Sequence, residues 1–249
     1  MYTTEANRKI KNKMKRIATL ITILFVAVSY GQSVDTFVNK ADAFFKTHVK
    51  NGRVDYKAIK SNPAALNELT TLAKDVRVSK SNAKSYQAFW INAYNITVIK
   101  GIVENYPVQG PLKIKGFFDK TTHDIGGLKT TLNDLENNLL RKVFPKEARF
   151  HFVLVCAGLG CPPIINEAYT PAKLEAQLQR QTVKALNDPK FIRVKGNKVQ
   201  ISQIFEWYKG DFTQGGSEVD YINKFRKEAL PAKAKVSYYP YDWTLNQVK

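Results

Sequence analysis

Apolar positions recur at helical spacing through the first third of the chain. The apolar residues from Phe37 to Phe45 lie three or four positions apart, and Ser33 can cap the helix that they predict. The same spacing predicts a second helix over residues 63–76. Residues 85–103 are apolar on almost every side, which is typical of a helix that is buried all round.

Strand patterns are fewer and come later. The run 150–156 is apolar on both faces and predicts a central strand. Two short runs that flank Gly196-Asn197 predict a hairpin. Helices outweigh strands without regular alternation, which favours an α+β fold in one domain, with the aromatic-rich helix packed against a small mixed or antiparallel sheet. Further helices are predicted over residues 131–143, 170–186, 202–212 and 217–229, and a late strand over 236–241.

Residues 1–31 have the pattern of a secretory signal peptide. Lys and Arg dominate its start, and an apolar run follows from Ile17 to Val28. Met14 heads a more usual signal and is an alternative start. This run is shorter than the roughly 20 residues that span a membrane, so we expect no stable membrane span once the signal is removed. The expected product is one exported domain over residues 33–249, in the periplasm or outside the cell.

The net charge of +18 comes from 39 Lys and Arg against 21 Asp and Glu. Residues 1–31 carry about +5 of it, so about +13 remains on the exported domain. Such a charge suits nucleic-acid binding, but an exported protein does not normally meet the chromosome, and we expect no nucleic-acid partner. The charge then indicates either a basic solvated surface or attraction to anionic polymers and headgroups of the cell envelope.

The composition and the motifs argue against several classes of site. Two cysteines and three histidines provide few ligands for a zinc site, and no bound metal is expected. The chain has no Walker loop, no nucleophile elbow of the serine hydrolases, no zinc-protease motif and no dinucleotide fingerprint. We therefore expect no cofactor.

The densest group of reactive side chains lies in residues 151–163, which hold His151, Cys156 and Cys161. Three interpretations remain open: a disulfide between the two cysteines, two buried structural thiols, and a catalytic Cys161 thiolate beside backbone N–H groups. On a regular strand, His151 and Cys156 point to opposite faces. A catalytic Cys161 would then need another histidine. His123, in a polar loop, is the candidate, and simple solvation is its alternative role.

Three further polar or aromatic features have both a structural and a functional interpretation. Asn92 and Asn95 lie on one face of the apolar helix, where buried amides need partners. They either tie the helix to a neighbouring loop or strand, or line a cleft with Trp90. Asp242 and Trp243 belong to an aromatic cluster near the C-terminus, which either packs in the core or recognises a sugar or peptide.

Several of these stretches together resemble the domain-of-unknown-function family 547, which occurs in bacterial envelope proteins and in plants. The resemblance covers about residues 80–245 and implies one domain in an exported setting, without an assigned activity. Its motifs are the segments 88–95, 132–141, 149–156, 161–163 and 241–246.

A weaker similarity links the order of elements to papain-like and transglutaminase-like folds. In those folds an aromatic-rich buried helix precedes a strand that a histidine opens. Their nucleophilic cysteine begins the helix, whereas residues 86–95 contain no cysteine. The similarity therefore implies either a site remodelled around Cys161 or a domain without catalysis.

Three functions are consistent with these features. The first is an exported binding or scaffolding module for an envelope ligand, a peptide or a glycan, with a cleft near His151, Cys156 and Cys161. The second is a thiol-dependent hydrolase or acyl transferase acting on amides or esters. In it, the Cys161 thiolate attacks, His151 or His123 is the base, and N–H groups of the turn 158–160 hold the oxyanion. The third is an anionic-polymer binder, and whether the chain is an enzyme stays open.

Overall fold

The computed structural model describes Met14 and residues 34–249. Apart from Met14, the predicted signal peptide and the Ser33 cap lie outside the described residues. Within the described part of the chain, no helix is both long enough and apolar enough to cross a membrane.

The first described elements form a helical layer. Residues 34–48 are helical, and the short strands β1 (Val49–Lys50) and β2 (Arg53–Val54) pair antiparallel after them. Helix α2 (Tyr56–Ser61) begins where the Asp55 side chain accepts a hydrogen bond from the Ala58 N–H. Helix α3 (Ala64–Asp75) follows Pro63 and buries Leu66 and Leu69, close to the prediction.

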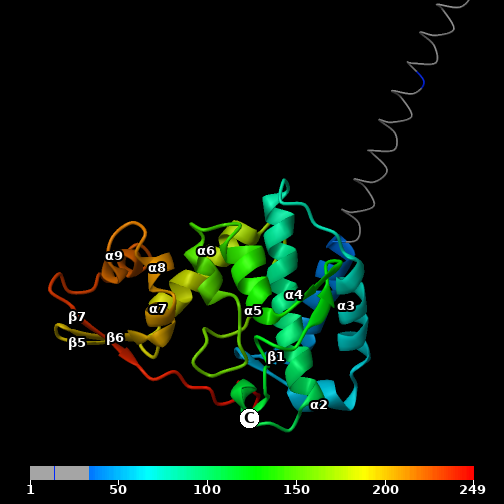
Figure 1. Ribbon diagram of the computed structural model, residues 1–249. Helices are drawn as coiled ribbons and strands as arrows, with labels where there is room; N and C mark the ends of the chain where they lie inside the picture. Colours follow the sequence, from blue (N-terminus) through cyan, green and yellow to red (C-terminus); the bar gives the residue numbers. More distant parts are fainter. Residues whose placement is uncertain (1–13, 15–33) are drawn as a thin grey trace, which may run out of the picture.

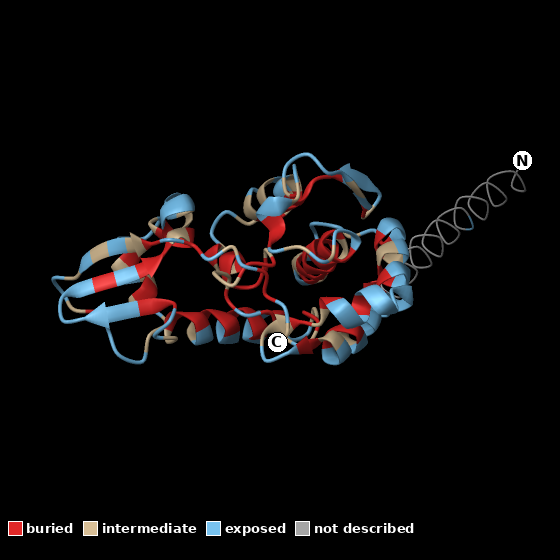
Figure 2. Cartoon of the chain, turned by 90° about the horizontal axis from the view of Figure 1, so that it is seen from below, coloured by how far each residue is buried: buried red, intermediate tan, exposed pale blue. Residues whose placement is uncertain are grey.

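Helix α4 (Ala83–Glu104) is the centre of the larger core. The Asn82 side chain caps it by accepting from the Ser85 N–H. Because its sequence is apolar on every side, most of its residues are buried, and it packs against α2 and α3. In Figure 2 the helix is seen almost along its axis and is mainly red.

A small antiparallel hairpin covers the aromatic part of α4. It consists of β3 (His123–Ile125) and β4 (Leu128–Thr130), joined by Gly126 and Gly127. Gly126 has φ +63°, and a Cβ there would lie 2.6 Å from the Trp90 ring. Glycine is therefore required at this turn, and the predicted packing of the aromatic-rich helix against a small sheet is found here.

A capped helical segment follows this hairpin. The Thr131 side chain accepts from the Asp134 N–H at 3.0 Å, as the capping pattern predicts. Helix α5 (Leu132–Asp134) then continues into the π-helix η2 (Leu135–Arg141). An earlier 3-10 turn, η1 (Pro111–Lys113), begins after Gly110.

The predicted central strand over residues 150–156 is wrong. The 3-10 helix η3 (Ala148–Phe152) occupies its first half, and the residues that follow join no sheet. The reason is the Asn95 side chain, which donates to the Val153 carbonyl and accepts from the Val155 N–H, both at 2.9 Å. One amide thus satisfies the groups that a neighbouring strand would have paired.

The C-terminal half contains the main sheet. Strands β5 (Ile192–Lys195) and β6 (Lys198–Ser202) form the predicted antiparallel hairpin, and β7 (Lys235–Tyr239) adds to β6 in parallel. The sheet lies at the left of Figure 1. The helices of this half are α6 (Leu174–Leu186), α7 (Gln203–Trp207), α8 (Lys209–Phe212) and α9 (Glu218–Asn223), the last ending earlier than predicted.

The buried residues form two hydrophobic clusters. One surrounds α4, and the other lies between the sheet, α6 and α7. The segment 241–248 leaves β7 and runs to the helical side, as Figure 1 shows in red. Its backbone bonds to Gln109, Ala157 and Val54. The mixture of helices with small sheets confirms the α+β class.

Candidate functional site

A cavity of about 220 Å³ opens between the two hydrophobic clusters. Its walls come from α4, η2, η3, α7, the cysteine segment and the C-terminal segment. The lining is mainly aromatic, with five polar side chains among the rings. The aromatic members are Tyr94, Phe118, Trp207, Tyr208, Tyr241 and Trp243, and the polar ones are Asn133, Glu136, His151, Cys156 and Cys161.

His151 is held rigidly in the wall of this cavity. Its side chain is only 2% exposed, and its Nε2 lies 2.8 Å from Asp211 Oδ2. Since a carboxylate accepts, Nε2 carries the proton of this bond. The other nitrogen, Nδ1, lies 3.9 Å from Glu136 Oε1. The imidazole also stacks on the Tyr208 ring at 4.0 Å between centroids, so its orientation is fixed from two sides.

Asp211 receives a second donor from the π-helix. Arg141 Nε donates to the same Oδ2 at 2.7 Å, and its guanidinium lies over the Tyr208 ring. Burial raises the pKa of Asp211, but the hydrogen bonds from His151 and Arg141 outweigh it and hold the pKa well below its usual value. Asp211 is therefore an anion with two donors.

Glu136 has a different environment from Asp211. Its side chain is 13% exposed, and no Lys or Arg of the described chain forms an ion pair with it. Burial, the nearby Glu136 charge and a hydrogen bond with the Glu136 side chain raise the pKa of Tyr208, whose ring forms part of the same wall. The cavity thus contains a carboxylate that forms no ion pair with a Lys or Arg of the described residues, although the charge of Arg141 acts on it without contact.

The two cysteines are free thiols in the structure, so the predicted disulfide is not formed there. The Cys156 N–H donates to Cys161 Sγ at 3.0 Å. The Tyr241 hydroxyl lies 3.0 Å from Cys156 Sγ and 2.8 Å from Cys161 Sγ. The thiols and the phenol therefore form one hydrogen-bonded cluster in the cavity wall.

This cluster makes the two thiols unequal. Burial raises the pKa of Cys156, but hydrogen bonds from Cys161, Tyr241 and the Gly158 N–H outweigh it and lower that pKa. Burial and the Cys156 sulfur raise the pKa of Cys161 well above its usual value. The first thiolate to form is thus Cys156, whereas the sequence pointed to Cys161.

The backbone N–H groups of the turn 158–160 do not form the expected oxyanion site. Leu159 N–H donates to the Thr244 carbonyl and Gly160 N–H to the Asp242 carbonyl, both at 2.8 Å. The next donor, Cys161 N–H, binds the Gly158 carbonyl. A Cβ at Gly160 would lie 2.9 Å from the Tyr241 ring, so these glycines allow close docking of the C-terminal segment.

His123 does not join the thiols. It begins β3, where burial lowers the pKa of its imidazole, and its Nε2 has no hydrogen-bond partner within the described structure. It is not among the residues that line the aromatic cavity. In contrast, His151 does share a wall with Cys156 and Cys161, because the regular strand that would have separated their faces is not formed.

Asn92 and Asn95 tie α4 to loops rather than line the cavity. Asn92 Nδ2 donates to the Tyr169 carbonyl at 2.7 Å, and its Oδ1 accepts from the Tyr169 N–H at 3.0 Å. Asn95 binds the segment before Cys156 in the same way. Trp90 is 2% exposed and packs under the β3–β4 turn.

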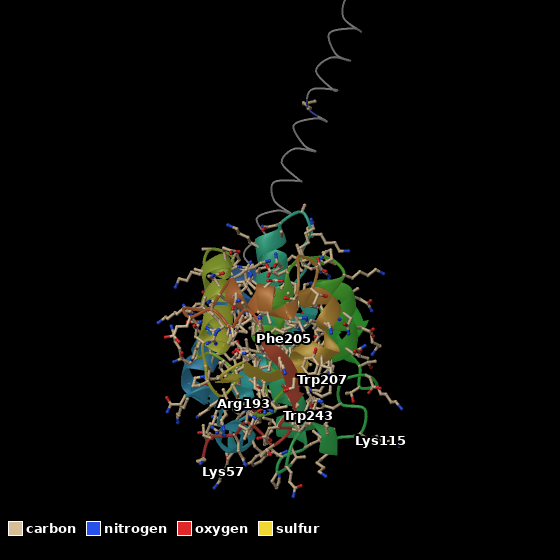
Figure 3. The ribbon with its side chains drawn as sticks, turned by 90° about the vertical axis from the view of Figure 1, so that its left-hand side faces the viewer. Lys57, Lys115, Arg193, Phe205, Trp207 and Trp243 are labelled. Carbon is tan, nitrogen blue, oxygen red and sulfur yellow. The ribbon has the colours of Figure 1, made fainter. Side chains whose placement is uncertain are left out.

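The C-terminal aromatic cluster splits into two roles. Trp243 lines the cavity and stacks against Trp207 at 5.9 Å between centroids. Asp242 meets no histidine, and its carboxylate accepts from the Thr244 N–H at 2.9 Å. Figure 3 labels both tryptophans on one face of the molecule, with Arg193 to their side.

The sequence interpretation missed several residues of the site. Glu136 and Arg141 lie in a segment quoted only for its family resemblance, and Asp211 and Tyr208 lie in short helices without a motif. The one available signal was His151, because a histidine in an apolar run needs a partner. Across the described residues, no group of three or more His, Cys, Asp or Glu side chains could hold a metal ion.

A second, basic groove of about 340 Å³ lies beyond the cysteine turn. Cys161 lines both concavities, so the turn separates them. The groove contains Arg53, Lys184, Lys190 and Arg193. None of these four cations forms an ion pair with a carboxylate in the part of the chain that is described.

Comparison with known proteins places part of this chain in a family. No curated protein and no solved structure matches it. Residues 78–186 match the family described as "Protein of unknown function, DUF547". The matched stretch contains α4, His151 and both cysteines, but ends before Asp211 and Trp243. The family match inferred from the sequence is thereby confirmed for residues 78–186, while the 241–246 motif lies outside the matched stretch.

Proposed function

We propose that this chain is an exported binding module of the cell envelope, and that its aromatic cavity holds a group of a peptide or glycan. The observation that carries the proposal is the convergence of six aromatic rings and five polar side chains on one cavity of about 220 Å³. Apolar pockets with a few fixed polar groups are the usual form of small-molecule sites. The setting in the periplasm or outside the cell is part of the proposal and rests on the pattern of residues 1–31.

The polar groups of the cavity are organised for recognition. His151 is fixed by Asp211 and Tyr208, and the thiols are fixed by Tyr241. Side chains that are already ordered lose little entropy when a ligand arrives. At the rim, Trp207 is 46% exposed and offers an indole face on which a sugar or a peptide side chain can stack.

Replacing Trp207 with Ala should weaken ligand binding by up to about tenfold, since a stacked aromatic contact contributes about 0.5–1.5 kcal/mol beyond the area that it buries, and about 1.4 kcal/mol is tenfold in affinity. The measurement is calorimetric titration of the full chain with a set of cell-wall peptides and glycans. Leu112→Ala, at a residue 56% exposed and outside the cavity, is the matched control and should leave the affinity unchanged. Equal affinities for the Trp207 variant and the unchanged chain would place binding elsewhere.

A thiol-dependent hydrolase is the second candidate, with Cys156 in the role expected of Cys161. Its thiolate would attack an ester or amide carbonyl, the leaving group would depart with a proton, and water would release the acyl group from the thioester. The lowered pKa of Cys156 favours this candidate. The engaged N–H groups of residues 159–161 weigh against it, because they leave no turn donor for the oxyanion.

Alkylation of the full chain with iodoacetamide tests the state of the thiols. Cys156 should react before Cys161, and its rate should reach half its maximum at a lower pH in the folded chain than in the urea-unfolded chain, because its folded pKa is lowered. Tyr241→Phe removes one donor and should move that midpoint upward. Peptide mass spectrometry measures the extent of alkylation at Cys156 and at Cys161. Preferential labelling of Cys161, or a Cys156 midpoint in the folded chain at or above its midpoint in the unfolded chain, would exclude an activated Cys156.

Binding of an anionic envelope polymer is a third candidate, supported by the basic groove. Two carboxylates, Asp188 and Asp242, line that groove beside its four cations, so the lining keeps a formal charge of +2 (4 − 2). The dependence of ligand affinity on salt concentration distinguishes this function from binding in the aromatic cavity. Affinity for a polyanion should fall steeply as salt rises, whereas stacking of an uncharged ligand in the cavity should not.

A further inference from the structure

We infer that the ligand group held in the aromatic cavity is an organic cation, a primary ammonium, received by Glu136 and His151 Nδ1 inside a wall of aromatic rings. This inference rests on the proposed function, because it names the chemistry of the group that the cavity holds. It departs from the overall charge of the chain, which by itself would predict an anionic ligand.

The first support is the charge balance of the cavity wall. Asp211 has two donors, His151 and Arg141. Glu136, on the same π-helix as Arg141, bonds to the Tyr208 side chain and interacts with the Arg141 charge without contact, but it forms no ion pair with a Lys or Arg of the described structure. Removing a carboxylate from water is costly unless a cation or several donors compensate. A ligand ammonium would supply that compensation.

The second support is the geometry between Glu136 and His151. Nε2 donates its proton to Asp211, so Nδ1 is the acceptor of the ring when the ring carries one proton. Glu136 Oε1 also accepts only, and it lies 3.9 Å from Nδ1, too far for a direct hydrogen bond. A nitrogen about 2.8 Å from each atom fits between them. Two acceptors at this separation call for a group with at least two N–H donors.

The third support is the set of ring faces around this pair. The Tyr208 ring already contacts His151 and Arg141, but the cavity is also lined by four other aromatic residues, Tyr94, Phe118, Trp207 and Trp243. The negative face of an aromatic ring attracts a cation and gains about 0.5–2 kcal/mol per contact, most where water is excluded. An anion would meet the same faces and the Glu136 charge with repulsion. The wall therefore selects for positive charge.

A charge series with one ring tests the inference: benzylammonium, benzyl alcohol and benzoate. Each is titrated into the full chain by ligand-observed NMR at neutral pH. The expected order of affinity is the cation, then the alcohol, then the anion, with about a tenfold to hundredfold gap between the first two, as for a charge-assisted pair. Glu136→Gln, which keeps the side-chain size, should remove most of this gap and change the affinity of the alcohol less than threefold.

The control is Asp119→Asn, which removes the same charge from an exposed residue that does not line the cavity. It should keep the preference for the cation. Equal affinity of the alcohol and the cation in the unchanged chain would overturn the inference alone and leave the cavity as a binding site. A Glu136→Gln variant that still prefers the cation would overturn the inference in the same way. Absence of binding by all three compounds would overturn the proposed function together with the inference.

Discussion

Asn95→Ala is expected to lower the free energy of unfolding by about 2–6 kcal/mol. The side chain is 2% exposed and binds both the Val153 carbonyl and the Val155 N–H at 2.9 Å. Its removal leaves two buried backbone groups without partners, and each costs about 1–3 kcal/mol. Water cannot replace the amide easily, because the neighbouring side chains of α4 and of residues 153–155 are buried.

Urea denaturation followed by circular dichroism measures this loss. Asn138→Ala is the control, because that exposed asparagine bonds only to the Asp134 side chain and its removal should cost less than about 0.5 kcal/mol. The thiols provide a second measurement. Since Asn95 positions the segment that precedes Cys156, alkylation of the cysteines should become faster in the variant. A stability change no larger than that of the control would show that the segment is held by other contacts.

Leu245→Ala is expected to cost about 2–5 kcal/mol, the range for a buried leucine. Leu245 is 3% exposed within the larger cluster, and its N–H donates to the Gln109 carbonyl at 2.8 Å. The segment at Gly110 cannot move closer to fill the space that the shortened side chain leaves. It already packs tightly on the C-terminal segment, because a Cβ at Gly110 would lie 2.1 Å from the Trp243 carbonyl oxygen. The lost methyl groups should therefore leave a cavity.

The matched control for Leu245 is Leu112→Ala, since Leu112 is 56% exposed and should change stability by less than about 0.5 kcal/mol. Thermal unfolding of both variants gives the comparison. The Leu245 variant should also bind cavity ligands more weakly, because its segment carries Trp243. Similar stability of the two variants would mean that the C-terminal segment is anchored by its backbone bonds alone.

The sequence predicted the helices well where caps and periodicity agree. Thr131 begins the helix predicted over residues 131–143, and the all-round apolar pattern of α4 predicts its burial, whereas α2, which Asp55 caps, was not predicted. The strand predicted over residues 150–156 was wrong, because an apolar run indicates that residues are buried but does not show that their backbone pairs in a sheet. Its partner is a side chain from α4, and the sequence contains no signal for such a pairing.

The candidate site was predicted only in part, for a related reason. The segment with His151, Cys156 and Cys161 was recognised from its composition and does line the cavity. Its partners Glu136 and Asp211 come from other helices, and only the tertiary fold brings them near. The pairing of Cys161 with His123 rested on a strand that does not form, and the two residues lie in different parts of the structure.

The walls of the cavity come from segments far apart in the sequence, with Tyr94 in α4 and Trp243 in the last segment. A growing polypeptide leaves the ribosome in order, so the helical side exists long before the wall that closes it. The site is therefore absent from every incomplete nascent chain. A ligand that binds only the closed cavity stabilises the completed fold by mass action. Occupancy of the cavity thus reports that assembly has finished, in addition to the presence of the ligand.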